Sequence, residues 1–115
     1  MTTKGERRLR AIFKRWIPLL GLSNWDISIE LAPDLPDTTD GIEAAADCHA
    51  SWQYERAVIR FSLHTVNEDT DAQLERHVVH ELMHCLLAEL RETHKMSNEE
   101  RTAVMLTRAF VRAVA

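Results

Sequence analysis

Three side chains within the stretch HVVHELMHCLL, residues 77–87, have the types and the spacing of a catalytic metal site. His80 and His84 are four residues apart, so on a helix their side chains lie one above the other on the same face. Two imidazole nitrogens placed in this way can both reach one zinc ion at about 2.0–2.1 Å. Glu81 lies about 100° around the helix, where it can take a proton from a water molecule that the metal has made more acidic. The pattern His-Glu-x-x-His therefore predicts a hydrolytic metal centre.

The alternative is that His80, Glu81 and His84 are buried side chains without a metal, the histidines being hydrogen-bonded to backbone carbonyl groups. The three residues form the polar stripe of an otherwise apolar helix, so we expect them to face protein rather than bulk water. Burial of three ionisable groups without partners is costly, and one bound metal ion would satisfy all of them. The pattern favours the metal site for this reason.

The helix that carries this pattern is predicted to run from a capping box at Thr70 and Gln73 to about Leu90. A helix is also predicted over residues 3–17, where a capping box precedes apolar residues at helical spacing. After a polar loop, another helix is predicted from about residue 98 to the end of the sequence. The metal-binding helix therefore lies between two other helices in the chain.

Three segments of alternating apolar and polar residues precede that helix, and each predicts a half-buried strand. They cover residues 24–31, 42–52 and 57–63. The short connection between the second and third segments, residues 53–56, indicates a hairpin. Residues 64–70 are predicted to be a polar link to the following helix. The order predicts an α+β fold, in which helices cover one face of a three-stranded, mainly antiparallel sheet.

The sequence VVHELMHCLL resembles the active-site helix of the zincin metallopeptidases. The predicted order, helix, three strands, HExxH helix and ligand helix, is similar to the minimal zincin core. The chain also resembles small phage and prophage metallopeptidases and, more distantly, the SprT-like and ImmA/IrrE-like groups. The specific part covers residues 77–110. The resemblance implies one zinc-dependent peptidase domain over residues 1–115, with one zinc ion and a cleft beneath an edge strand.

The resemblance also implies where the third metal ligand lies. Metzincins need Gly and His at the positions of Leu87 and Leu90, so that subfamily is excluded. The gluzincin type takes a glutamate from a following helix. Glu100, with Ala103 three residues later and Leu106 six residues later, fits the pattern of the ImmA-like groups. Val104 departs from that pattern, because Asn or Asp is common there.

Helical geometry separates Glu100 from its neighbour Glu99. The apolar face of the predicted last helix is centred nearer Glu100, so we predict Glu100 as the third ligand and keep Glu99 as the alternative. The other glutamate would then hydrogen-bond a ligating histidine. His94 is a weaker candidate ligand. Either glutamate can also be explained as negative charge placed favourably at a helix N-terminus.

Further side chains are candidates for the surroundings of the metal. His77 lies one turn before His80 and is predicted to line the pocket or to stabilise an oxyanion, and Tyr54 in the hairpin is a second donor. The alternatives are an ordinary capped histidine and a surface aromatic residue. His49 and His64 are interpreted as surface histidines with no role in the site.

Composition limits the class of protein. The chain has 115 residues, 45% of them hydrophobic and 28% charged, which is typical of one soluble domain, and no segment is long and apolar enough for a membrane span. The two cysteines, Cys48 and Cys85, form no CxxC pair and are expected to be free thiols in the cytoplasm. Six basic residues and one acidic residue fall within residues 1–20, although the net charge is −4.

The sequence therefore predicts a zinc metallopeptidase that acts on a peptide or protein substrate, with Glu81 as general base. The alternative is a non-catalytic zinc-binding module with a regulatory or DNA-associated role. The basic residues 1–20 are the one feature that favours nucleic acid, but a solvated helix face is the favoured explanation, because no aromatic or Gly-rich nucleic-acid motif accompanies the charge.

Overall fold

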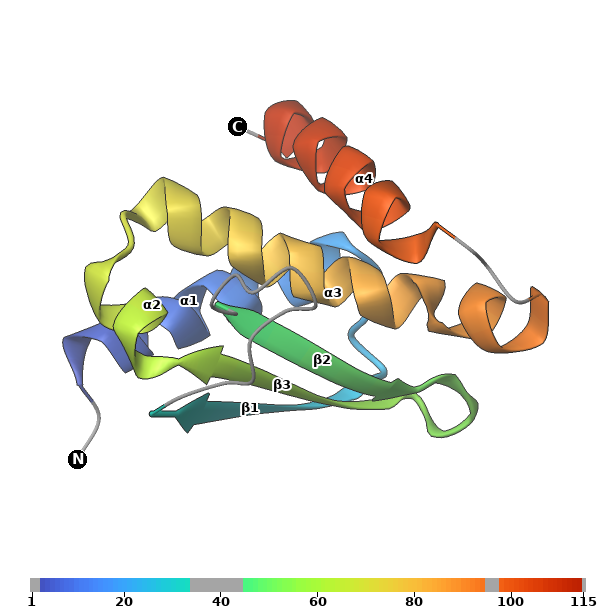
Figure 1. The fold of residues 1–115 in the computed structure, drawn as a ribbon, viewed down its shortest axis with the longest axis horizontal. Helices are drawn as coiled ribbons and strands as arrows, with labels where there is room; N and C mark the ends of the chain where they lie inside the picture. Colours follow the sequence, from blue (N-terminus) through green and yellow to red (C-terminus); the bar gives the residue numbers. More distant parts are fainter. Residues whose placement is uncertain (1–2, 34–44, 95–97, 115) are drawn as a thin grey trace.

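The computed structural model describes residues 3–33, 45–94 and 98–114, without the side chain of His94. In these residues the chain forms a mixed α+β structure (Figure 1). Its elements are α1 (Lys4–Leu19), β1 (Asp26–Ala32), β2 (Ala46–Ser51), a 3-10 turn (Trp52–Tyr54), β3 (Arg56–Ser62), α2 (Leu63–Glu68), α3 (Asp71–His94) and α4 (Glu99–Val114).

The long helices begin where their capping residues predict. The Thr3 hydroxyl accepts the backbone N–H of Glu6 at 3.1 Å, and α1 starts at the next residue after Thr3. Thr70 and Gln73 exchange two hydrogen bonds, at 2.9 and 3.2 Å, ahead of α3. Both helices extend past their predicted ends, α1 through Pro18 and α3 by one further turn. This extra turn of α3 contains Arg91, a residue that was predicted to lie in a loop and whose side chain reaches the candidate site.

The three described strands form a mixed sheet, so the prediction of a mainly antiparallel sheet is wrong. The strand order is β1-β3-β2, with β1 parallel to β3 and β2 antiparallel to β3. The reason is burial: β3 carries the fully buried residues Ala57, Ile59 and Phe61 and takes the central place, where both of its edges are paired. β2 follows β1 in the chain but lies at the opposite edge, so β1 pairs with β3 and not with the strand that follows it.

The strands share one apolar face. In the parallel pair Ile29 lies opposite Ile59, and in the antiparallel pair Cys48 lies opposite the same Ile59. This face packs against α1 and α3, which lie together on one side of the sheet (Figure 1). The rings of Phe13 and Phe61 meet edge to face, with centroids 5.9 Å apart. The predicted alternation and the one-sided helical cover are both confirmed.

The apolar face of α3 fixes its rotation about its own axis. Leu74, Val78 and Leu82 are fully buried and recur at four-residue spacing. Burial of one such leucine contributes on the order of 2 kcal/mol. With that face held against the sheet and α1, the stripe that carries His80 and His84 faces β2 and α4.

A short helix, α2, was not predicted, because residues 64–70 were interpreted as a polar link and Leu63 as the end of the third strand. Ser62 caps it by accepting the backbone N–H of Thr65 at 3.1 Å, and Val66 is fully buried. α1 approaches this helix at Gly5, where a Cβ atom would lie 2.9 Å from the Val66 carbonyl oxygen. The close contact requires glycine at this position.

The last described helix, α4, runs back over α3 in roughly the opposite direction (Figure 1). Its buried residues Ala103 and Thr107 face the body of the protein.

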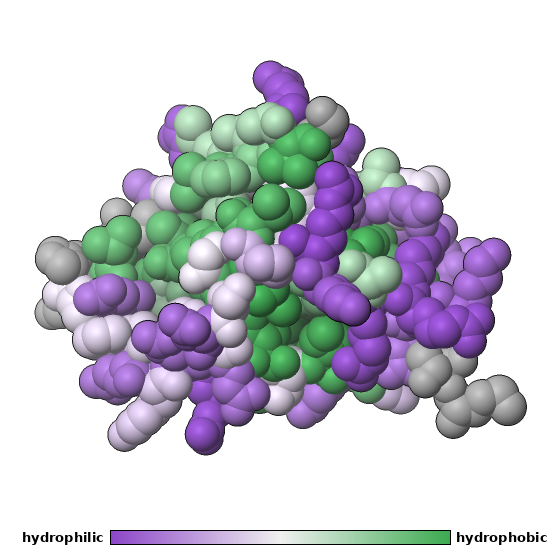
Figure 2. Space-filling view, turned by 180° about the vertical axis from the view of Figure 1, so that it is seen from behind, coloured by the Kyte–Doolittle hydropathy of each residue, from purple (hydrophilic) through white to green (hydrophobic). Residues whose placement is uncertain are grey.

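On the opposite side of the molecule from the view of Figure 1, hydrophilic side chains gather where α1 begins and hydrophobic ones are exposed elsewhere (Figure 2). None of the helices in the described residues combines the length and the apolar character that a membrane crossing requires.

Candidate metal centre

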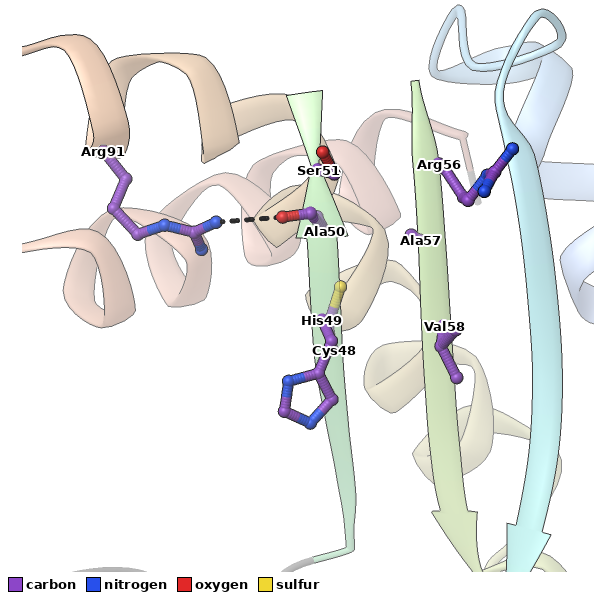
Figure 3. Close-up of a pocket in the computed structure, with 8 residues that line it drawn as sticks. All are labelled: Cys48, His49, Ala50, Ser51, Arg56, Ala57, Val58 and Arg91. Carbon is purple, nitrogen blue, oxygen red and sulfur yellow. Dashed lines mark hydrogen bonds between the residues drawn. The ribbon is translucent and has the colours of Figure 1, made fainter. Parts of the chain in front are cut away.

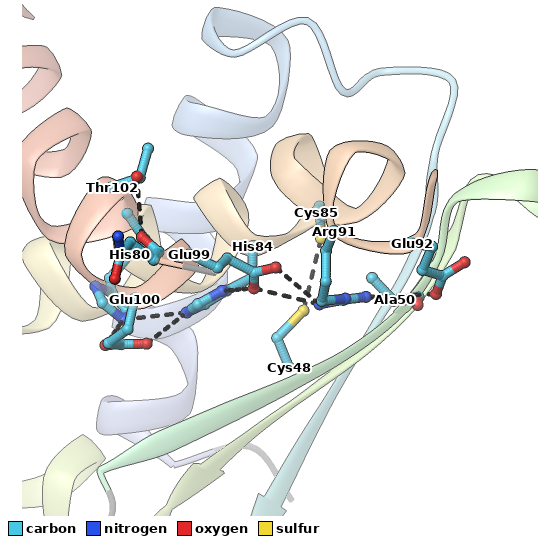
Figure 4. Close-up of polar contacts among 12 residues, drawn as sticks. Cys48, Ala50, His80, His84, Cys85, Arg91, Glu92, Glu99, Glu100 and Thr102 are labelled. Carbon is cyan, nitrogen blue, oxygen red and sulfur yellow. Dashed lines mark hydrogen bonds and ion pairs between the residues drawn. The ribbon is translucent and has the colours of Figure 1, made fainter. Parts of the chain in front are cut away.

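Three of the predicted residues come together between α3 and α4. His80 and His84 lie on α3, and Glu100 lies in the first turn of α4, with one ligand atom from each within 4.8 Å of the others. The carboxylate of Glu100 reaches both rings, at 2.7 Å from Nε2 of His80 and 3.1 Å from Nε2 of His84 (Figure 4). The helical spacing of the histidines and the reversal of the chain before α4 produce this cluster.

The spacing of these atoms fits a zinc ion. Ligands at about 2.0–2.1 Å from a tetrahedral zinc lie about 3.3 Å from one another. The two Nε2 atoms of His80 and His84 are 3.3 Å apart, and Nε2 of His84 is 3.1 Å from Glu100. The donor set, two imidazoles and one carboxylate, is one that catalytic zinc uses. The contact between His80 and Glu100 is shorter, as expected for a direct hydrogen bond.

The two candidate histidines are mostly withdrawn from water. Their side chains are 19% and 14% exposed. Burial lowers the pKa of His80, while the carboxylate of Glu100 acts in the opposite direction. The neutral imidazole that burial favours is also the form that binds a metal.

Glu81 is buried in the same pocket. Its residue is 6% exposed, and burial raises the pKa of its carboxyl group to about 8, with further contributions from the negative charges of Glu100 and Asp47. A buried carboxyl group with a pKa near neutrality is suited to accept and return a proton at ordinary pH. Its position on α3 follows from the helix rotation that buries its neighbours Val78 and Leu82.

Glu99 occupies a different place from Glu100, although the two are adjacent. Its Oε2 lies 2.5 Å from Nδ1 of His84, the ring nitrogen that does not face Glu100. The Glu99 side chain is 14% exposed, whereas that of Glu100 is 71% exposed. The more buried Glu99 therefore holds the ring of His84, whereas the more exposed Glu100 reaches the Nε2 atoms of both histidines.

Arg91 completes this arrangement from the extra turn of α3. Its guanidinium lies 3.3 Å from Oε2 of Glu99 and donates to the backbone carbonyl oxygen of Ala50 at 3.5 Å (Figure 4). A continuous series of polar contacts thus joins β2 to His84. Such contacts to a ligating histidine fix the orientation of its ring.

A pocket of about 430 Å³ opens beside these residues, and His80, Glu81 and Glu100 line it together with His77. Nε2 of His77 lies 3.3 Å from a carboxylate oxygen of Asp69, which holds the ring at the pocket wall. Ala46, the first residue of β2, and Ala45 before it also line the pocket.

The other predicted candidates lie elsewhere. Tyr54 is 76% exposed in the hairpin turn and does not line this pocket. His49 and His64 are exposed, on β2 and α2. His94 ends α3, and its side chain lies outside the described part of the chain.

The two cysteines are close to each other below the site. Their Sγ atoms are 3.8 Å apart, and both are free thiols, as predicted. Cys85 is 1% exposed and belongs to the core. The contact with Cys85 and burial raise the pKa of the Cys48 thiol, which therefore stays protonated.

A second pocket, of about 410 Å³, lies at the hairpin end of β2 and β3. Figure 3 shows Arg91 reaching Ala50 on one side of this pocket, while Arg56 stands on the side towards β1. None of His80, Glu81 or Glu100 lines it. This second pocket shares Arg91 with the series of contacts from β2 to His84, but it is separate from the metal group.

Arg91 and Asp69 are the site residues that the sequence reasoning missed. Arg91 was assigned to a loop, because the helix was expected to end at Leu90. Its spacing of seven residues from His84 places it on the same helix face and would have indicated it, had the helix been extended. Asp69 precedes the helix and shows no signal in the sequence that links it to His77.

No protein-family model, curated protein or solved structure matches this chain.

Proposed function

We propose that this protein is a zinc-dependent metallopeptidase of the zincin type. The observation that supports this most directly is that Glu100 of α4 meets both Nε2 atoms of His80 and His84, with Glu81 in the same pocket. Three protein ligands leave a fourth position open, which is the arrangement of catalytic rather than structural zinc. When bound there, zinc would polarise the peptide carbonyl group and lower the pKa of a water molecule towards neutrality.

The buried carboxylate of Glu81 is the general base of the proposed reaction. It takes one proton from the attacking water and delivers it to the nitrogen of the departing amine, so that the proton is conserved through the step. Burial supports this role, because a carboxylate with its pKa raised to about 8 is a stronger base than an exposed one and takes a proton from water more readily.

Glu99 and Arg91 act on His84 rather than on the substrate. Glu99 accepts the Nδ1 proton of His84, so the tautomer with a free lone pair on Nε2 is favoured. That lone pair points towards Glu100 and His80. The pair of contacts therefore prepares His84 for a metal before any metal is bound.

The edge strand β2 is the proposed place for the substrate backbone. The N–H of Ser62 donates to the carbonyl oxygen of Ala45, and the antiparallel alternation then turns the backbone groups of Ala46, Cys48 and Ala50 away from β3. The contact of Arg91 with the Ala50 carbonyl oxygen agrees with this direction. An extended peptide can pair with Ala46 and Cys48 and lie across the metal pocket.

Metal analysis tests the proposed centre. Protein purified without chelators or an affinity tag is measured by elemental analysis beside His84→Ala and Glu100→Ala. We expect about one zinc per chain in the wild type and almost none in either variant. Wild-type protein that stays free of metal after incubation with zinc would show that the histidines are ordinary buried residues.

Hydrolysis is tested separately with Glu81→Gln. This variant keeps the zinc ligands, so we expect it to bind zinc like the wild type and to cleave no peptide from a mixed peptide library. Equal cleavage by both proteins would remove Glu81 from the mechanism. Zinc binding without cleavage by the wild type would favour the alternative, a zinc-binding module that uses the fold for contact alone.

A further inference from the structure

Three arginines meet at one end of the metal pocket. Arg76 on α3 and Arg108 on α4 line the metal pocket, and both also line an adjoining pocket of about 390 Å³. Arg112 and Val111 form the rest of that second pocket. We call Arg76, Arg108 and Arg112 the arginine cluster. Through its two shared members, the cluster is continuous with the space beside His80 and Glu100.

Helical spacing explains why the cluster lies there. Arg76 is one turn before His80 on α3, and Arg108 is about two turns after Glu100 on α4, and both arginines line the pocket of the metal group. The two helices run in roughly opposite directions, so a turn back along α3 and two turns forward along α4 lead to the same end of the pocket. The same packing that joins the two histidines to Glu100 therefore joins the three arginines.

The arginine cluster has no partner of opposite charge among the described residues. Ion pairs give a carboxylate to Arg8, Arg15 and Arg60, for example, but among the described residues none is made by a member of the cluster. All three are exposed. Arg108 and Arg112 are four residues apart on one helix, where like charges repel. The cluster therefore does not serve the stability of the fold.

We propose that the arginine cluster binds a carboxylate group of the peptide substrate. The proposal rests on the proposed peptidase function and names its substrate class, a peptide with an acidic side chain or a free C-terminus on one side of the cleaved bond. A guanidinium group presents two parallel N–H donors that match the two oxygens of a carboxylate. The cluster offers three such groups around one hollow.

The distance from the metal group limits which substrate position carries the carboxylate. Along the helix axes, Arg76 lies about 6 Å from His80 and Arg108 about 12 Å from Glu100, at about 1.5 Å per residue. An extended peptide advances about 3.3–3.6 Å per residue. The carboxylate is therefore expected two to four residues from the cleaved bond.

A single carboxylate fits this surface better than a polyanion. The net charge of the chain is −4, and the pocket that adjoins the cluster contains the carboxylates of Glu81 and Glu100. An extended nucleic acid backbone would have to pass these negative charges, whereas one peptide carboxylate reaches only the cluster.

Binding by zinc-loaded Glu81→Gln, which is expected not to hydrolyse the probe, tests the proposal. The probes are three dye-labelled decapeptides of alanine, serine and glycine, followed by fluorescence anisotropy at low salt. The first has one central Asp and an amidated C-terminus, the second has Asn in its place, and the third has Asn with a free C-terminus. Tighter binding of the first identifies a side-chain carboxylate, and tighter binding of the third identifies a terminal one.

Arginine variants then locate the binding. In the Glu81→Gln protein, Arg108→Gln and Arg112→Gln should each weaken binding of the preferred probe by about three- to tenfold and leave the uncharged probe unchanged. The matched control is Arg101→Gln, which removes an exposed arginine from the same helix that lines neither pocket. It should leave all three affinities as they are.

Three results would overturn the inference. The first is equal affinity for the three probes, and the second is equal loss in Arg101→Gln and Arg108→Gln. The third is tight, arginine-dependent binding of a dye-labelled single-stranded oligonucleotide without any preference among the peptides. Failure of the peptidase function is distinguishable, because wild-type protein would then cleave nothing while the acidic probe still bound through Arg108.

Discussion

Glu99 and His84 are joined by a contact of 2.5 Å between Oε2 of the carboxylate and Nδ1 of the ring. Glu100, the next residue, meets the same ring at its other nitrogen, 3.1 Å from Nε2. Two consecutive glutamates at the start of α4 thus contact opposite sides of one imidazole. Experiment can resolve most directly which of the two is a metal ligand and which holds the ring of His84.

Removal of each glutamate charge should have a different effect on zinc affinity. Glu100→Gln removes a proposed ligand and should weaken zinc binding by at least about 100-fold, whereas Glu99→Gln loosens a ligand that remains and should weaken it by about 10-fold. Competition with a zinc-chelating dye measures both. Glu89→Gln, an exposed glutamate on α3, is the control and should bind zinc normally. A larger loss in Glu99→Gln than in Glu100→Gln would exchange the two roles.

Arg91 should influence zinc only through Glu99. Its guanidinium lies 3.3 Å from Glu99 and cannot reach the metal group directly, so Arg91→Gln should weaken zinc binding by about 3-fold. In a protein that already carries Glu99→Gln, the same change should have no further effect on zinc, because the partner is gone. Additive losses in this double-mutant cycle would show that Arg91 acts by another route, such as its contact with Ala50.

The contribution of Glu81 to the stability of the metal-free protein should fall as the pH rises from about 5 to 8. Burial raises the pKa of Glu81 to about 8, above its ordinary value, so the folded state holds a proton that the unfolded state has lost in this range. The loss of unfolding free energy is absent below the pKa that Glu81 has in the unfolded state. It grows between that value and the pKa in the folded state, and it is constant at higher pH. Relative to Glu81→Gln, the wild type should lose about 2–4 kcal/mol of unfolding free energy across this range.

Urea unfolding with a chelator present, at pH 5, 6.5 and 8, measures this loss in both proteins. The comparison with Glu81→Gln removes the contribution of His80, which titrates in both. A difference between the two proteins that does not change with pH would show that the Glu81 carboxylate is solvated and not buried.

Two leucines on α3, one buried and one exposed, should differ in their contribution to the stability of the fold. Leu82→Ala empties a fully buried position and should lower the unfolding free energy by about 2–5 kcal/mol. Leu86→Ala, one turn later and 40% exposed, should cost less than about 1 kcal/mol. Urea unfolding of the metal-free proteins tests this. Equal losses would mean that Leu86 is covered in solution, by a partner or a second copy of the chain.

The metal group could be predicted largely from the sequence, because its information is local. The four-residue spacing of His80 and His84 fixes their common face on any helix. The capping pairs at Thr3 and Thr70 likewise gave the starts of α1 and α3, since a cap depends on residues within one turn.

The choice between Glu99 and Glu100 could not be made on the same basis. Helical geometry favoured Glu100 as the more inward residue, yet Glu99 is 14% exposed and Glu100 is 71% exposed. What distinguishes them is which nitrogen of His84 each one meets, and that depends on how α4 crosses α3. Crossing geometry arises from packing between elements and leaves no short-range pattern in the sequence.

The parallel pairing of β1 with β3 is another non-local feature. Each strand was located from its alternation, but alternation is the same in parallel and antiparallel sheets. The sheet order depends on which strand is central, and here the burial of Ile59 and Phe61 decides it. The contact between Asp69 and His77 is hidden for a similar reason, because it spans the junction of two helices.

The division of the metal group between α3 and α4 has a consequence for synthesis of the protein. The ribosome makes His80, Glu81 and His84 before it makes Glu100, so the nascent chain at first has two imidazoles and no carboxylate to complete the group. Zinc held by two ligands alone dissociates easily, and Glu81 then has no activated water beside it. If the site acts as we propose, the chain gains hydrolytic competence only after α4 has folded back onto α3.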